Sequence, residues 1–164
     1  MSIIEPNLGQ NQPRWLDDAE DRAWRGYLRM RTLLHARILR DLAHEAGLSG
    51  PDYDVLSHVS ESPGHRARLG ELAERMAWSR SRLSHHLTRM QQRGLVTREN
   101  VPSDGRGASV VLTDAGFRTI QTAAPGHVAS VRHNLIDLLS REQLDALTSI
   151  TDTVIGHLTA DQPS

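Results

Sequence analysis

The sequence predicts a mainly α-helical protein that carries one small β-hairpin. Three observations predict this fold class. Only 4% of the 164 residues are aromatic, whereas leucine, alanine and arginine are abundant. Glycine and proline occur in clusters that separate long stretches, in which apolar residues recur every three or four positions as on one face of a helix. Two β-prone segments flank a turn-rich run at residues 102–107, which is typical of a hairpin.

The first helix is expected from about Trp15 to Ala46, behind a polar arm at residues 1–14. Its apolar residues share one face, and its early turns are acidic, which suits the N-terminal end of the helix dipole. Gly47 can end it. A short second helix is expected to begin at Ser49-Gly50-Pro51, because proline is well suited to a first helical position.

A third short helix leads through the turn Ala77-Trp78-Ser79 into a fourth helix, for which Ser79 is a good N-cap. The apolar stripe Leu83, Leu87 and Met90 of this fourth helix faces the core, and Gly94 ends it. The β-prone segments at residues 95–101 and 109–112 follow. A short helix, a three-residue turn, a polar helix and a hairpin, in that order, make a winged helix-turn-helix.

Two further helices follow the hairpin. One is capped by Thr113 or Asp114 and is expected to bend or break at Pro125-Gly126. The last begins with Ser140 and Gln143, which have capping-box spacing. The first and last helices carry wider apolar stripes than a compact lobe needs. Pairing across a two-fold axis would bury the excess, so we expect a homodimer.

Charge is unevenly distributed, although the formal net charge is only −1. Residues 1–65 hold seven arginines against ten acids, residues 66–106 nine against four, and residues 107–164 three against six, which gives −3, +5 and −3. A basic segment between two acidic ones is the electrostatic footprint expected of a lobe that contacts DNA. There is no cysteine, which excludes disulfides and thiol-based redox sensing.

The fourth helix, projected at about 100° per residue, turns a polar face away from the core. We predict that Ser81, Arg82 and His85 on this helix contact base edges, since arginine can bond two acceptors of guanine. The other predicted contacts, to phosphates or neighbouring bases, are Ser79, Arg80, His86 and Arg89. At the hairpin tip, Arg106 is predicted to enter the minor groove, with Asp104 orienting it through a charge-assisted hydrogen bond.

Several short motifs between Leu69 and Gly116 occur together: Leu72-Ala73, the Ser-x-Ser pair Ser79 and Ser81, Arg93-Gly94-Leu95-Val96, Pro102-x-Asp104-x-Arg106 and Leu112-Thr113-x-x-Gly116. With these motifs the chain resembles the MarR (multiple antibiotic resistance regulator) family of winged helix-turn-helix transcription regulators. One difference concerns the end of the fourth helix, where that family often has acids and this chain has Thr88 and Gln91. The difference should increase attraction to phosphate, and it leaves the operator sequence open.

The resemblance implies a homodimeric repressor that binds a pseudo-palindromic operator in double-stranded DNA and is released by a small aromatic or phenolic effector. It implies a single domain at residues 15–164, in which residues 49–116 form the DNA-binding lobe. Residues 15–48 and 117–164 then supply the dimerisation helices. The aromatic and histidine side chains that could line an effector pocket are Trp24, Tyr27, His35, Tyr53 and Phe117.

Two alternatives keep the same fold. One is a zinc-responsive regulator, for which the candidate ligands are His44, Glu45, His127 and His133. Helical metal ligands prefer spacings of three or four, and neither histidine pair within one helix has that spacing, so we assign no metal. The other alternative is an architectural protein that binds DNA without sequence preference.

An enzyme is not expected. The sequence contains no G-x-S-x-G, P-loop, H-E-x-x-H or dinucleotide-binding motif, and it lacks both lysine and cysteine, which removes many nucleophiles. No cofactor is expected either. No signal peptide and no run of about 18 apolar residues occurs, so we expect no membrane span and a cytoplasmic protein.

Overall fold

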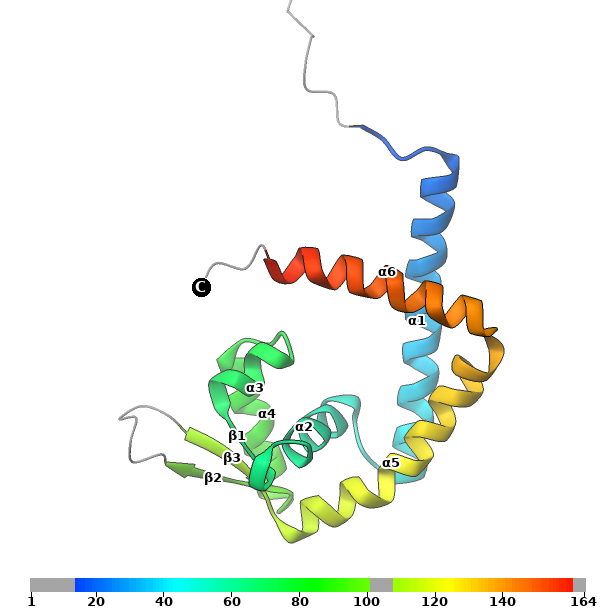
Figure 1. Ribbon diagram of the computed structural model, residues 1–164. Coiled ribbons are helices and arrows are strands. Elements are labelled where there is room, and N and C mark those ends of the chain that lie inside the picture. Colours follow the sequence, from blue (N-terminus) through cyan, green and yellow to red (C-terminus); the bar gives the residue numbers. More distant parts are fainter. Residues whose placement is uncertain (1–13, 101–107, 161–164) are drawn as a thin grey trace, which may run out of the picture.

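The structure, a computed structural model, describes residues 14–100 and 108–160. A small lobe with a three-stranded sheet is carried by longer helices that extend away from it (Figure 1). The helices are α1 (Asp18–Ala46), α2 (Gly50–Ser60), α3 (Leu69–Arg75), α4 (Arg80–Gln92), α5 (Asp114–Asn134) and α6 (Arg141–Ala160). The strands are β1 (Arg66–Arg68), β2 (Val96–Asn100) and β3 (Ala108–Leu112), and two short 3₁₀ helices are η1 (Pro63–His65) and η2 (Ile136–Leu138). The predicted fold class, mainly α-helical with a small wing, is confirmed.

The helix ends follow local signals in the sequence. Helix α1 begins at an Asp17 capping box and ends at Gly47, whose φ of +63° is the left-handed conformation that glycine adopts readily. Helix α2 begins with a capping box in which Ser49 and Asp52 bond each other's backbone amides. The expected caps at Gly47 and at the Ser140 start of α6 are therefore present.

The sheet is antiparallel in the order β1-β3-β2. The predicted hairpin is confirmed, with Val96 opposite Leu112 across β2 and β3. Strand β1 is an addition to the prediction. Its three residues are too few to show an alternating pattern, and it exists because it pairs with β3 more than forty positions along the chain, with Arg66 opposite Val111.

Helix α5 runs without a break through Pro125, so an interruption at Pro125-Gly126 is not found. The helix curves instead (Figure 1). Proline removes one backbone donor, but α5 lies along α1 and is held there on both sides of the proline. Ile120 and Ala123 are buried before it, and after it the Ser130 hydroxyl donates a 2.7 Å hydrogen bond to Asp41 of α1.

The hydrophobic core lies inside the lobe. Its largest fully buried side chains are Leu56, Leu72, Leu83, Leu87, Met90, Val55, Val59, Val96 and Val110. Helix α6 contributes nothing to it, since none of the residues 141–160 is buried. None of the helices in the described part of the chain has the length and apolar content that a membrane span requires.

Candidate nucleic-acid interface

Helix α4 is fixed in the lobe on one side and open to solvent on the other. Leu83, Leu87 and Met90 are fully buried in the core, as their spacing predicts. At the start of the helix, the Ser79 hydroxyl accepts a 3.2 Å hydrogen bond from the amide of Arg82. The helix is thus anchored at its N-terminal turn and along its length, which gives the exposed face a fixed orientation.

The exposed face of α4 carries most of the predicted DNA contacts. The side chains of this face are Ser79, Arg80, Ser81, Arg82, His85 and Arg89, all of which are exposed. Three of these six side chains are arginines, and the face holds no acid. A rigid helix that projects cations and hydroxyls has the shape and charge of an element that enters the major groove of DNA.

The prediction of a DNA contact for His86 is wrong, because this side chain is buried and only 7% exposed. Its Nε2 atom lies 3.1 Å from Oδ1 of Asp52 in α2, and its Nδ1 atom lies 3.0 Å from Nη2 of Arg89. The edge of the imidazole also meets the Trp78 ring at a centroid distance of 5.7 Å. His86 therefore belongs to a group of contacting side chains beneath the exposed face, which we call the support of that face.

Asp52 is the centre of this support, and it is 3% exposed. Its carboxylate accepts a 2.7 Å hydrogen bond from Arg93 Nη1 and a 3.2 Å bond from the amide of Ser49. Burial alone would raise the pKa of Asp52, but the hydrogen bonds from Arg93 and Ser49 outweigh it, so this pKa lies below its ordinary value. The charged carboxylate joins α2 to the middle of α4 at His86 and to the C-cap of α4 at Arg93.

Two arginines of the exposed face are held by aromatic rings. The Arg82 guanidinium lies over the indole of Trp78, with its central carbon 4.0 Å from the ring centroid. Arg89 is bonded to the His86 imidazole. Asp52, Trp78 and Arg93 were not predicted as site residues. The Ser49-x-x-Asp52 spacing signals only a cap, and no local pattern reveals that Asp52 also reaches a helix some forty residues later.

The base of the wing is tied to α4 by Arg98 of β2. Arg98 donates to the carbonyl oxygen of Ser84 and, at 3.2 Å, to the hydroxyl of Thr88. Across the sheet, Arg66 forms a 3.1 Å ion pair with Glu99. These contacts fix the base of the wing relative to the exposed face of α4. The predicted tip residues, Asp104 and Arg106, lie outside the described residues.

Known proteins share this arrangement. A family model described as MarR family matches residues 46–107. The chain is also 44% identical to AbsC, a MarR family transcriptional regulator from Streptomyces coelicolor; the match covers 90% of this chain and 99% of AbsC, with a TM-score of 0.86. The chain belongs to the MarR family.

A second MarR family regulator from Streptomyces coelicolor, Sco3205, is 41% identical over 93% of this chain and 94% of its own, with a TM-score of 0.87, and its crystal structure is a complex with DNA. The transcriptional regulator HosA from Escherichia coli O111:H- is 35% identical over 78 residues, so the chain matches 56% of HosA's length. Membership of the MarR family makes this protein a DNA-binding transcription regulator, and the expectation that it is not an enzyme is confirmed.

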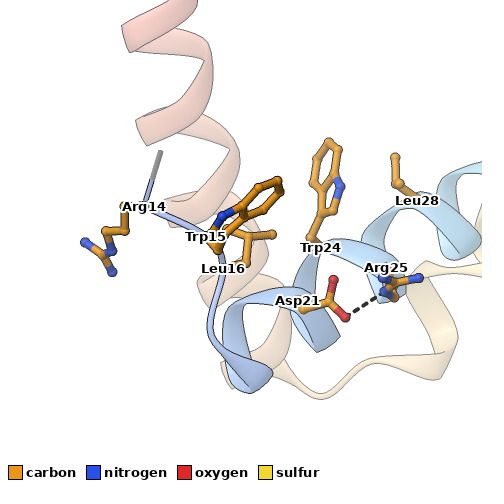
Figure 2. A pocket seen from close by; sticks show the side chains of 7 residues that line it. All are labelled: Arg14, Trp15, Leu16, Asp21, Trp24, Arg25 and Leu28. Atoms are coloured by element: carbon orange, nitrogen blue, oxygen red, sulfur yellow. Dashed lines mark hydrogen bonds and ion pairs between the residues drawn. The ribbon is translucent and has the colours of Figure 1, made fainter. Parts of the chain in front are cut away.

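This MarR-family chain leaves large apolar side chains exposed on α1 and α6. On α6, Ile150, Val154 and Leu158 are each at least half exposed. A hollow of about 610 Å³ lies at the start of α1. Figure 2 shows the side chains that line it, among them the Asp21–Arg25 ion pair: Arg14, Trp15, Leu16, Asp21, Trp24, Arg25 and Leu28. Apolar surface of this extent on two separate helices is typical of a chain that has a partner.

The five candidate effector residues do not meet in one pocket. Trp24 and Tyr27 stack on each other at a ring distance of 5.8 Å near the start of α1, where both are about half exposed. His35, further along α1, is exposed. Helical spacing shows which residues share a face of α1, but it does not show which helix will lie opposite that face.

The other two candidates lie at the junction of the lobe and α5, each against a histidine. The Tyr53 ring is 4.2 Å from that of His127, and the Phe117 ring is 4.5 Å from that of His65. Burial lowers the pKa of His127, while the charge of Asp54 opposes this. His127 Nδ1 is buried without a hydrogen-bond partner.

The candidate zinc ligands His44, Glu45, His127 and His133 belong to α1 and α5. His44 and His133 are exposed, and His127 is stacked on Tyr53. In the part of the chain that the structure describes, no three histidine, cysteine, aspartate or glutamate side chains are grouped so that they could hold a metal ion. The described residues thus offer no observation in favour of a zinc-responsive regulator.

Proposed function

We propose that this MarR-family protein is a homodimeric repressor that acts in the cytoplasm on a pseudo-palindromic DNA operator. The observation that carries the proposal is the exposed face of α4, which combines three arginines with the Ser81 and His85 side chains on a helix anchored by the core. Ser81, Arg82 and His85 contact base edges, and Ser79, Arg80 and Arg89 contact phosphates or neighbouring bases. Arg106, oriented by Asp104, enters the minor groove.

The homodimer is supported by the exposed apolar side chains of α1 and α6. Residues 15–48 and 117–164 form the dimer, and residues 49–116 form the DNA-binding lobe. A two-fold axis that buries these helices against a second copy would bring the two α4 helices about one DNA turn, roughly 34 Å, apart. That spacing is what a pseudo-palindrome requires.

The effector is a small aromatic or phenolic molecule that binds between the lobe and the long helices. Its binding causes the protein to dissociate from DNA. Tyr53 supports this position, because its ring lies against α5 where the lobe joins the dimer helices. A thermal-shift series with phenolic acids tests it, since a ligand that binds the folded state raises the unfolding temperature with the logarithm of its concentration. A zinc series serves as the second arm and would favour the metal-responsive alternative if zinc alone stabilised the protein.

Footprinting on the DNA upstream of the protein's own gene tests the operator. We expect protection of two half-sites related by a pseudo-two-fold axis. Arg82→Ala should relax preference at one base pair in each half-site, at a cost of about 1–3 kcal/mol. Arg106→Ala should instead weaken binding to all sequences and reduce the salt slope by about one per lost phosphate contact. Tight binding without sequence preference would contradict the repressor and favour an architectural role.

A further inference from the structure

We propose that Trp78 and His86 are positioning residues for DNA recognition, which hold Arg82 and Arg89 in the orientations in which these arginines meet DNA. The proposal rests on the proposed function, in which Arg82 and Arg89 contact DNA. It adds that the geometry of both arginines is set before DNA binds, by two rings that do not touch DNA themselves. Such pre-ordering matters because an unrestrained arginine loses rotamer freedom on binding.

The contact between Arg82 and Trp78 leaves the arginine's donors free. The central carbon of the guanidinium lies over the indole, 4.0 Å from the ring centroid. A guanidinium in parallel stacking on a ring keeps its N–H groups in its own plane, pointing outward from the ring, so such an arrangement leaves Arg82 able to form the paired bonds that guanine requires. Trp78 is itself fixed, because it is half-buried and its amide donates a 2.9 Å hydrogen bond to the carbonyl of Ala73.

The contact between Arg89 and His86 fixes the protonation of the imidazole. Arginine has only donors, so Nδ1 of His86, 3.0 Å from Arg89 Nη2, must be the acceptor. The imidazole is therefore neutral, with its proton on Nε2, which lies 3.1 Å from the Asp52 carboxylate. Nε2 makes no hydrogen bond of standard geometry, so Asp52, from a different helix, favours this tautomer through its negative charge.

The two rings form one unit. The His86 imidazole meets the Trp78 indole edge-on, with an interplanar angle of 89°. The charged groups that face His86 are Asp52 from α2, and Arg89 and Arg93 from the second half of α4 and its C-cap. A second proton on His86 would place a donor at Nδ1, facing Arg89, which would break that bond and set two cations against each other.

Double-mutant binding measurements test the Trp78 arm. The full-length protein and its variants are each incubated with a pool of duplexes that have a randomised central segment, and the bound DNA is sequenced. Trp78→Leu should lower preference, roughly two- to tenfold, at the same base pair that Arg82→Ala affects. Trp78→Phe, which keeps a ring, should retain most of the preference. Arg80→Ala is the matched control, and it should weaken binding without changing preference at the base pair that Arg82→Ala affects.

Non-additivity is the decisive outcome, since Trp78→Leu should have no further effect once Arg82 is alanine. The inference is overturned if the two effects multiply, or if Trp78→Leu weakens binding to every sequence equally. A wild-type protein without base preference would overturn the proposed function as well, which separates the two failures. Thermal unfolding of each variant identifies any general loss of structure.

The pH dependence of DNA binding tests the role of His86. This measurement does not depend on whether the Trp78→Leu variant folds. Burial lowers the pKa of His86, although the Asp52 charge opposes this, so affinity should be constant near neutral pH and fall several-fold as the pH drops below the ordinary histidine range. His86→Asn keeps an acceptor but does not titrate, so it should flatten this dependence. His133→Asn, which removes an exposed histidine of α5 outside the exposed face of α4, should preserve it; the opposite pattern would overturn the inference.

Discussion

Among single residues, Ala77 in the turn before α4 carries backbone strain, because its φ is +50°. For a residue with a Cβ atom the left-handed conformation costs about 1–2 kcal/mol. Glycine avoids that cost but adds about 0.5–1 kcal/mol of backbone entropy to unfolding. We therefore predict that Ala77→Gly raises the free energy of unfolding by up to about 1 kcal/mol, as measured by urea denaturation.

The control for Ala77 is an alanine with ordinary helical geometry. Ala43 is exposed within α1, so Ala43→Gly should lower the free energy of unfolding by about 1 kcal/mol. If both substitutions destabilised the protein equally, strain at Ala77 would not be the cause. The sequence alone does not reveal this strain, since alanine favours helix and Ala77 directly follows Met76, the C-cap of α3.

A buried histidine, His86, and a half-buried one, His127, make stability depend on pH. Burial lowers the pKa of both His86 and His127 in the folded state, with nearby carboxylates opposing part of the shift. The unfolded chain, with an ordinary histidine pKa of about 6.5, therefore binds more protons in this range. The stabilisation is complete above that value, and the free energy of unfolding should fall as the pH drops through about 6.5 and below.

Urea unfolding at several pH values checks this dependence. His127→Phe keeps a ring against Tyr53 but cannot be protonated, so the slope of unfolding free energy with pH should decrease. His85 is exposed, and His85→Asn should leave the slope unchanged. An unaltered slope in His127→Phe would show that this histidine does not contribute.

The exposed face of α4 was predictable residue by residue, with one exception. Counted at about 100° per residue, His86 falls about 60° from Leu83, near the edge of the buried side. A histidine there is buried only if it finds a partner, and that partner is Asp52, thirty-four positions earlier in the chain. Periodicity describes one helix at a time, so it does not reveal such a contact.

Among the elements, the junction between the hairpin and α5 depends on Gly116. A Cβ atom at this position would lie 2.0 Å from the carbonyl oxygen of Leu95. The Thr113 hydroxyl donates to the Gly94 carbonyl at 2.6 Å and accepts from the Gly116 amide at 3.0 Å, so the first turn of α5 is pressed against the end of α4. This explains in physical terms the Leu-Thr-x-x-Gly pattern that sequence analysis singled out.

We predict that Gly116→Ala lowers the free energy of unfolding by about 2–3 kcal/mol, because the backbone of Leu95 must move. Chemical denaturation measures the change. Ala115→Ser, an exposed neighbour in the same turn, is the control and should stay within about 0.5 kcal/mol of the wild type. A Gly116→Ala protein as stable as that control would mean that the junction can open at little cost.

Elements with local signals were predictable, and those that depend on distant partners were not. The starts of α1, α4 and α6 follow from caps within three residues. Strand β1 depends on pairing with β3, and the continuity of α5 through Pro125 depends on packing against α1. In both cases tertiary contacts outweigh the local preference of the chain.

For the whole molecule, the single chain has a closed core in the lobe and an open apolar surface on its long helices. Core residues such as Leu56 and Leu87 are fully buried, whereas α6 has no buried residue among residues 141–160. The width of the apolar stripes indicated this surface from sequence. Which faces meet in a dimer depends on a second chain, and helical periodicity does not supply that information.

The last prediction concerns α6. Val154 is half exposed between Ile150 and Leu158 on the apolar stripe, and Val154→Asp would place a charge in the proposed dimer interface. Light scattering should show the molar mass falling from twice the 18.3 kDa of one chain towards a single chain. DNA affinity should fall at least about 100-fold, because two linked lobes bind far more tightly than one. Ser149→Asp lies on the opposite face of α6 and should change neither quantity; if it dissociated the protein as well, the stripe would not be the interface.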